Sequence, residues 1–281
     1  MAGLPSIAII GAGRLGRTLG ERLIGDGVRV RYVVRRGRRN LPAAFLDDDP
    51  TAYRGVRWIV VATPDDQIWA AARQLADLGV VGGQQVVLHL SGALDQNALK
   101  PLRLTGAALG SFHPLQSIAV AGAAEDRLRG SFAGLEGDAK AIRAGRRLAT
   151  ALGLIPVLLP PGSKPAYHAA GTFVSTLVVV LYQAAVSLVE RAGIPPKHAR
   201  LMFLPLMEGA IENLRLLPPR LAMTGAVRRG DAATIKTHLA ALSKADRELY
   251  VLLTRRAVEL ARTLALPPPR LAEIERLLGA R

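Results

Sequence analysis

The sequence predicts an α/β protein: a doubly wound parallel sheet in the N-terminal part, followed by an all-helical C-terminal domain. Short apolar runs alternate with helical patterns up to residue 159, and every segment after residue 162 has helical spacing. Pro160, Pro161 and Gly162 separate the two patterns. At 281 residues the chain also exceeds the length that one core usually holds. We therefore expect two domains, residues 1–160 and 161–281.

The first elements are a strand, a glycine turn and a helix. Residues 7–10 are apolar, and leucines then recur every four residues from position 15 to position 23. Glycines in G-x-G-x-x-G spacing lie where the period changes; they permit the turn, the approach of a pyrophosphate and close helix packing. This pattern predicts a Rossmann dinucleotide-binding unit, with the pyrophosphate near Gly11, Gly13, Arg14, Leu15 and Gly16.

The segment after the second strand indicates which dinucleotide is bound. Residues 28–34 have a strand pattern, and Arg35 and Arg36 follow them. Units that prefer NAD carry an acidic residue about 20 residues after the glycines, to hold the ribose hydroxyls. Two guanidinium groups suit a 2′-phosphate instead, by charge and by bidentate geometry. The sequence therefore favours NADP as the cofactor; the alternative is that these arginines belong to a basic surface loop.

Further strands are expected at residues 58–62, 86–90, 107–112 and 155–159, with a helix at 139–152. After the first of these, Thr63 is expected to cap a helix that has Pro64 at its first position. The carboxyl ends of parallel strands share one edge of the sheet, where nucleotides bind. Ala62, Thr63 and Pro64 are therefore further candidates for cofactor binding.

Hydride transfer to a carbonyl or imine needs a proton donor, which histidine supplies readily near neutral pH. His113, at a strand end, and His168, in an apolar helix, are the catalytic candidates. Each has a structural alternative: His113 precedes Pro114 and could fix a loop, and His168 could be a core histidine bonded to the backbone. His89 is expected to be structural. The candidate substrate-binding residues are polar: Ser91, Gln116, Ser175, Thr176 and Thr224.

Composition argues against several classes. The chain has no cysteine, which excludes thiolate chemistry and fits a cytoplasmic location, and no His, Asp or Glu constellation has metal-ligand spacing. The formal charge of +15 is scattered and aromatic residues are few, so we expect an anionic cofactor and substrate and no nucleic acid. No signal peptide is indicated.

Residues 165–189 carry no charged side chain, but their polar residues favour a helix buried on all sides over a membrane span.

Several motifs together resemble one family, the Rossmann-like proteins with a C-terminal domain of unknown function numbered 2520. They are the glycine turn, His-Leu-Ser-Gly-Ala at 89–93, Phe-His-Pro-Leu-Gln-Ser at 112–117, Tyr-His-Ala-Ala at 167–170, and Thr-Gly at 224–225 followed by Arg-Gly-Asp at 229–231. The resemblance implies a branch of the 6-phosphogluconate dehydrogenase and ketopantoate reductase group. It also implies a helical second domain, like the 6-phosphogluconate dehydrogenase C-terminal domain, that commonly dimerises, and we expect a homodimer.

Two positions depart from the family pattern. Thr176 stands where the family tends to have Asn, and Ala226 where it tends to have Pro. The leading hypothesis is an NADP-dependent oxidoreductase that reduces the carbonyl of a small anionic metabolite, such as a ketopantoate-like 2-oxoacid. One alternative is a non-catalytic NADP-binding sensor or assembly protein, motivated by Thr176 and by the lack of an evident catalytic lysine. The other is an imine reductase of the pyrroline-carboxylate reductase type.

Overall fold

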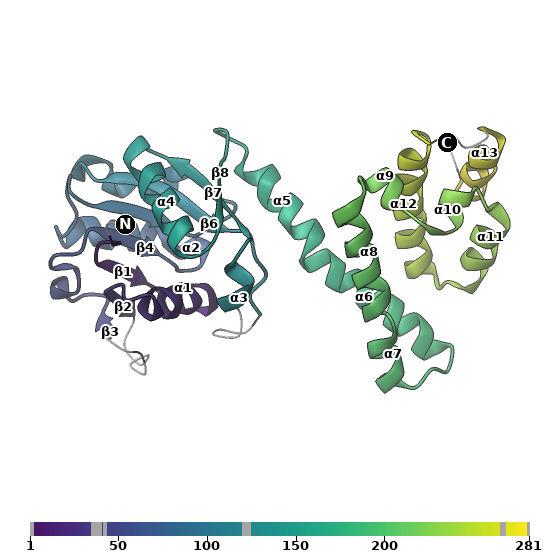
Figure 1. Cartoon of the computed structure of the whole chain (residues 1–281), viewed down its shortest axis with the longest axis horizontal. Coiled ribbons are helices and arrows are strands. Elements are labelled where there is room, and N and C mark those ends of the chain that lie inside the picture. Colours follow the sequence, from purple (N-terminus) through teal and green to yellow (C-terminus); the bar gives the residue numbers. More distant parts are fainter. Residues whose placement is uncertain (1–2, 35–40, 42–43, 120–124, 265–267, 280–281) are drawn as a thin grey trace. The chain divides into compact units, whose positions relative to one another are not determined.

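The computed structural model describes residues 3–34, 41, 44–119, 125–264 and 268–279. Its contacts divide the chain into two compact units, residues 1–175 and 176–281 (Figure 1). Helix α5 (Lys164–Val174) belongs to the first unit by this division. The domain boundary after residue 160 stays a prediction.

The first unit contains one eight-stranded sheet with strand order β3-β2-β1-β4-β5-β6-β7-β8. The strands are β1 (Ile7–Ile10), β2 (Val30–Val34), β3 (Ala44–Leu46), β4 (Trp58–Val61), β5 (Val86–His89), β6 (Ala108–Pro114), β7 (Phe132–Gly137) and β8 (Ile155–Leu158). All neighbouring pairs are parallel except β6 and β7. The predicted α/β class is confirmed, but the sheet is mixed, and β3 and β7 were not predicted.

Helices cover both faces of this sheet. The helices of this unit are α1 (Arg14–Gly25), α2 (Asp65–Asp77), α3 (Glu125–Leu128), α4 (Ala139–Ala151) and α5, with 3₁₀ segments η1 (Pro50–Tyr53) and η2 (Gln96–Thr105). Leu19 of α1 and Leu148 of α4 pack in one core cluster with Ile7 and Ile9. Ile68 of α2 and Leu99 of η2 pack in the other, with Ala8 and Ile10. Successive side chains of β1 thus pack on opposite faces of the sheet, as expected for a doubly wound sheet with helices on both faces.

The start of α2 differs from the sequence prediction. Helix α2 begins at Asp65, its N-cap residue is Pro64, and no side chain caps it. The hydroxyl of Thr63 is therefore not a cap. It is buried and has no hydrogen-bond partner among the residues that the structure describes.

The second unit is helical, and no strand occurs in its described residues. Its helices are α6 (Thr176–Arg191), α7 (Pro196–Met202), α8 (Leu204–Leu216), α9 (Pro219–Ala222), α10 (Gly225–Arg229), α11 (Ala232–Ala241), α12 (Lys244–Ala261) and α13 (Pro268–Leu277). Asp231 caps α11, because its carboxylate accepts the N–H of Thr234 at 3.0 Å. Ile235, Val258 and Ile274 lie in the core of this unit.

The long apolar segment differs from its prediction in two respects. Ser175 (φ −120°, ψ −84°) interrupts the single helix expected for this segment, which becomes α5 and α6. The expected burial on all sides is wrong for the chain by itself, because Phe173, Val174 and Val179 are 68%, 75% and 67% exposed. Residues 164–191 are long and apolar enough to cross a bilayer, which for one such segment is weak support for a membrane location.

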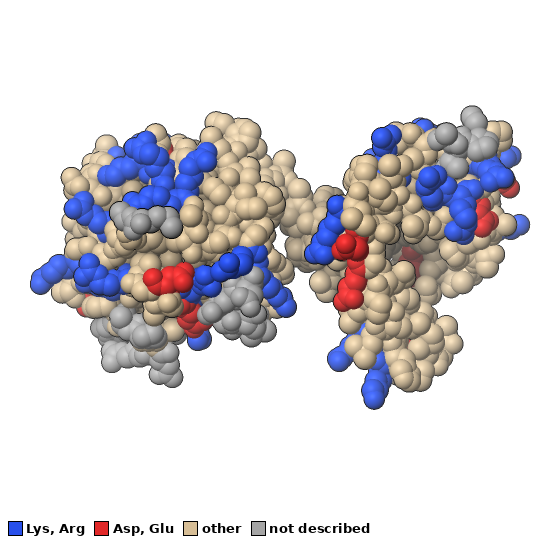
Figure 2. Space-filling model, in the orientation of Figure 1, with Lys and Arg blue, Asp and Glu red and all other residues tan. Residues whose placement is uncertain are grey.

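The basic side chains are spread over the surface. Figure 2 shows Lys and Arg on both units, in several separate groups and with fewer acidic side chains beside them. This view shows no single continuous basic stripe of the kind that tracks a nucleic acid backbone.

Candidate functional site

The glycine turn has the geometry that its sequence predicts. Gly11 has φ +95°, a left-handed conformation that glycine adopts without strain. A Cβ at Gly16 would lie 2.4 Å from the carbonyl oxygen of Gly11, so α1 packs directly on the turn. In the described part of the chain, no atom lies within 4 Å of a Cβ built on Gly13. A ligand therefore has room to approach the backbone at Gly13.

A cavity of about 360 Å³ opens beside this turn. It is lined by Ile10, Gly11, Ala12, Gly13, Val33, Val34, Asp47, Ala62, Thr63, Pro64, Gln67, Ala70, Ala71 and Gln74. The N-terminus of α1 at Gly13 has no side-chain cap, so its first N–H groups remain available to an anion. The unpartnered Thr63 hydroxyl lies in the same lining. These features suit the sugar and pyrophosphate of a nucleotide.

The remaining predicted cofactor residues differ in what the structure says of them. Arg35 and Arg36 lie outside the described residues; they follow Val33 and Val34, which line the cavity. Arg14 donates from Nη1 to the carbonyl of Ala119 at 3.2 Å, so its side chain reaches the loop after β6. The side chain of Leu15 packs against the core.

Two histidines and a tyrosine meet at the carboxyl end of β6. Nδ1 of His113 lies 3.1 Å from the hydroxyl of Tyr167, and the two rings meet edge to face. The ring centroids of His113 and His168 are 5.9 Å apart. Tyr167 and His168 come from α5, whereas His113 comes from β6. The structure therefore brings both catalytic candidates together within one unit.

Gly92 allows this convergence. A Cβ at Gly92 would lie 2.6 Å from Nδ1 of His168 and 2.8 Å from Nε2 of His113. Neither atom makes a hydrogen bond to any residue that the structure describes. Two imidazole nitrogens thus lie free above Gly92, a position where any side chain would displace them. In the sequence, Gly92 stands out only as part of the His-Leu-Ser-Gly-Ala motif at 89–93.

Burial determines the charge state of His113. Burial, and next the charge of Lys164, lower the pKa of His113 to about 4. His113 is therefore neutral at pH 7, and one of its ring nitrogens is a donor while the other is an acceptor. It is a neutral imidazole, not an imidazolium.

Lys164 is a site residue that sequence reasoning missed. It is fully buried, and its Nζ donates to the carbonyl of Ser91 at 2.5 Å and to the Ser111 hydroxyl at 3.0 Å. Among the described residues no carboxylate forms an ion pair with it. Burial lowers the pKa of Lys164 to about 8. The position of this lysine, at the start of an apolar helix, is the sequence feature that could have indicated a site residue. The sequence does not show, however, that this position lies against the edge of the sheet.

His89 is structural, as predicted. It is completely buried; its Nδ1 accepts the N–H of Ser91 at 3.2 Å, and its Nε2 lies 3.0 Å from the carbonyl of Asp95. Nδ1 is thus the acceptor, and Nε2 carries the proton. Burial, and next Lys164, lower the pKa of His89 to about 4.

The predicted substrate residues of the first unit already make hydrogen bonds. The Ser91 hydroxyl donates to Asp65 at 2.8 Å and accepts two backbone N–H groups. The Gln116 amide donates to the Arg127 carbonyl and to Ser131, both at 2.9 Å. Ser175 donates to the carbonyl of Gly171. Thr176 and Thr224 belong to the second unit, and substrate contacts of all five side chains stay predictions.

Among the described residues, no group of three His, Asp or Glu side chains has metal-binding geometry. The glycine cradle and the histidine pair lie at carboxyl ends of parallel strands, β1 and β6 of one sheet. In the strand order β1-β4-β5-β6, the glycine cradle and the histidine pair are three strand spacings apart, about 14 Å. The fold and the cradle define a Rossmann-type protein with a second, helical unit.

Comparison with known proteins agrees with this class. Residues 3–114 match the model of the Rossmann-like domain, and residues 131–257 match the model described as Domain of unknown function (DUF2520). The chain therefore belongs to the proteins that combine a Rossmann-like domain with a DUF2520 domain. No curated protein matches the sequence significantly.

Solved structures share the fold at low sequence identity. Protein TM1727 from Thermotoga maritima is 22% identical with a TM-score of 0.72, over 92% of this chain and 98% of its own. A proposed NADP oxidoreductase, BF3122 from Bacteroides fragilis, is 20% identical with a TM-score of 0.70, over 90% and 97%. An imine reductase from Myxococcus stipitatus in complex with NADP+ is 18% identical with a TM-score of 0.67, over 91% and 94%. At these identities the likeness shows the common fold.

Proposed function

We propose that this protein is an NADP-dependent oxidoreductase that reduces the carbonyl of a small anionic metabolite, a ketopantoate-like 2-oxoacid. The observation that carries the proposal is that a nucleotide cradle and a neutral histidine, His113, lie at one edge of one sheet. The structural neighbours named as NADP proteins add support for the cofactor. When bound, the reduced cofactor would supply the hydride, and Arg35 and Arg36 would hold its 2′-phosphate.

The chain's own residues would handle the proton. As hydride reaches the carbonyl carbon, the oxygen gains negative charge, and Nε2 of His113, in the tautomer that carries the proton there, can donate to it. Nδ1 of His113 can then take the proton of the Tyr167 hydroxyl at 3.1 Å. His168, whose Nδ1 faces the same point above Gly92, is the second candidate donor.

The electrostatics favour a carbonyl over an imine. The buried ammonium of Lys164 stabilises negative charge that develops on a substrate oxygen nearby, and it opposes the positive charge of an iminium. An imine reductase is the second candidate, supported by the structural neighbour with that activity. The two differ in substrate, so one panel of compounds separates them.

The binding half of the function is tested by thermal shift with NADPH, NADP+, NADH and NAD+ in parallel. A ligand that binds only the folded state raises its melting temperature, and we expect a shift of several degrees confined to the phosphorylated pair. Equal shifts with all four would contradict the role of Arg35 and Arg36. No shift with any of them would overturn the proposal.

The catalytic half is tested by NADPH oxidation with ketopantoate, other 2-oxoacids and cyclic imines. We expect turnover of an oxoacid, reduced about tenfold by His113→Ala or His168→Ala, because each removes one donor. His198→Ala, at an exposed histidine of the second unit, is the matched control and should change nothing. If activity survives both substitutions, neither His113 nor His168 is the proton donor. Tight NADPH binding without turnover of any compound would favour the sensor or assembly protein.

The uncovered apolar helices support the expected homodimer. Large apolar side chains on α6 and α8 are exposed, among them Val180 (52%), Leu206 (70%), Leu214 (54%) and Leu216 (72%). Monomeric proteins rarely leave so much contiguous apolar surface in water, and we propose that a second copy of the chain covers it. A cytoplasmic location likewise stays a prediction.

Sedimentation equilibrium tests the dimer. We expect twice the chain mass of 29.8 kDa, and a shift toward the monomer in Leu206→Glu, because a charge would be buried at the interface. Leu104→Glu is the matched control, since Leu104 is fully exposed on the first unit. A monomeric wild-type protein, or equal effects of both changes, would contradict the interface.

A further inference from the structure

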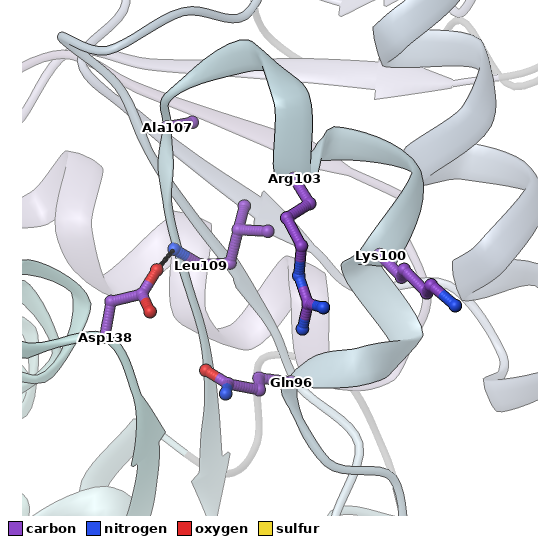
Figure 3. A pocket seen from close by; sticks show the side chains of 6 residues that line it. All are labelled: Gln96, Lys100, Arg103, Ala107, Leu109 and Asp138. Atoms are coloured by element: carbon purple, nitrogen blue, oxygen red, sulfur yellow. Dashed lines mark hydrogen bonds between the residues drawn. The ribbon is translucent and has the colours of Figure 1, made fainter.

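A second cavity lies at the other end of β6 from the candidate site. It has a volume of about 90 Å³ and is lined by Gln96, Lys100, Arg103, Ala107, Leu109 and Asp138 (Figure 3). Leu109 precedes His113 by four residues of one strand, so the two places are about 13 Å apart. This cavity is therefore separate from the nucleotide cradle and from the histidine pair.

Two cationic side chains stand at this cavity because of the form of η2. A 3₁₀ helix has three residues per turn, so Asn97, Lys100 and Arg103 project from one side of it. The hydrogen bond from Nη2 of Arg103 to Asn97 at 3.2 Å is consistent with this column. Within the described ranges neither cation forms an ion pair with a carboxylate. Both charges are thus free to bind an anion.

The one acidic group in the lining is held on the wall. Oδ2 of Asp138 accepts the N–H of Leu109 at 2.8 Å, and the N–H of Asp138 donates to the carbonyl of Leu109 at 2.9 Å. Figure 3 shows this contact on the side of the cavity away from Lys100. Arg103 therefore extends into a cavity whose one carboxylate is held by the backbone, while the side chain of Lys100 points away from that carboxylate (Figure 3).

The carboxamide of Gln96 completes the lining. Its Oε1 is buried, and its side chain forms no hydrogen bond to any part of the chain that the structure describes. In Figure 3 the guanidinium of Arg103 extends down the cavity toward this carboxamide. A buried amide without a protein partner is rare in native proteins, and such a group commonly bonds to an ion or a water molecule. The amide can offer its N–H₂ group to an anion after rotation about its terminal bond.

We propose that this cavity is a binding site for a small oxyanion, a phosphoryl group or a carboxylate. Arg103 would bind two of its oxygens through the fork of its guanidinium, Lys100 would add a charge at the rim, and the Gln96 amide would donate from within. A volume of about 90 Å³ holds one such group but not a nucleotide. The inference does not depend on the proposed reductase activity, because no residue is shared with that site.

Inorganic phosphate, titrated at constant ionic strength, tests the site by backbone amide NMR. We expect saturable shifts of the Gln96 and Leu109 signals at millimolar phosphate, and about tenfold weaker binding in the double variant Lys100→Ala, Arg103→Ala. The matched control is Arg143→Ala, Arg146→Ala, which removes the same charge from exposed positions on α4 outside the cavity. It should bind as the wild-type protein does. Phosphate at the glycine turn is recognised separately, through the signal of Gly13.

Acetate, titrated in the same way, distinguishes the two kinds of anion. Tighter binding of phosphate assigns the site to a phosphoryl group, and tighter binding of acetate assigns it to a carboxylate. Shifts that do not saturate with either anion would overturn the proposal. Equal weakening in the two double variants would overturn it as well, because it would show attraction to the general positive charge of the surface.

Discussion

Lys164→Met is expected to lower kcat for carbonyl reduction about a hundredfold while the fold stays intact. Lys164 is completely buried beneath the Ser91 turn and Ser111, so its ammonium acts in a medium of low dielectric constant. It holds the carbonyl of Ser91, the residue before Gly92, and in the proposed reaction it would add positive potential where the substrate oxygen gains charge. It contacts no substrate itself, and we regard it as a positioning residue.

The stability of this variant should change little. Burial of the ammonium without an ion pair is unfavourable, as the lowered pKa of Lys164 records, and methionine removes that cost. The change also leaves the carbonyl of Ser91 without its partner, which costs about 1–3 kcal/mol. The two effects oppose each other. A loss of activity would therefore not reflect unfolding, which urea titration at pH 7 checks directly.

Two further readouts separate this role from simple packing. Because the pKa of Lys164 is about 8, wild-type kcat should fall as the pH rises above 8, and this fall should be absent in the Met variant. The charge of Lys164 also lowers the pKa of His113, so the His113 signal in NMR should titrate at higher pH in the variant. Lys236→Met, at an exposed lysine, is the control. An unchanged pH profile together with an unchanged His113 titration would contradict the role.

The elements best predicted from sequence are those determined by local chemistry. The change from apolar run to leucines every four residues gives β1 and α1, and the glycine spacing gives the turn between them. The cap that Asp231 forms on α11 is likewise local, since capping depends on residues within one turn. Each of these depends on contacts within about ten residues, which a pattern in the sequence records.

Features that depend on distant contacts were not predictable. Strand β7 contains Gly134 and Gly137, which weaken its pattern, and its antiparallel pairing with β6 is set by the fold. The burial of Lys164 depends on Ser91 and Ser111, 73 and 53 residues away. The expectation that the apolar helix α6 is buried on all sides was wrong, because hydrophobicity alone does not say whether the same chain covers a helix.

The first unit is expected to lose stability steeply as the pH falls from 6.5 to 4. His89 and His113 have pKa values of about 4 in the folded protein and about 6.5 when unfolded, mainly because burial disfavours their charged forms. Between these two pKa values the unfolded chain binds more protons than the folded protein does. The free energy of unfolding therefore decreases as the pH falls. Each histidine accounts for up to about 3 kcal/mol of this decrease in the free energy of unfolding.

Urea unfolding followed by tryptophan fluorescence measures this loss, because Trp58 and Trp69 both lie in the first unit. In His89→Asn the side-chain oxygen can still accept the N–H of Ser91, but no titrating group remains at this position. The difference in unfolding free energy between pH 7 and pH 4.5 should therefore shrink by about 2–3 kcal/mol, whatever the stability at pH 7. His238→Asn, at an exposed histidine of the second unit, should leave the difference unchanged. If the unfolding free energy changes equally between pH 7 and pH 4.5 in the wild-type protein and in His89→Asn, protonation of His89 does not destabilise this unit.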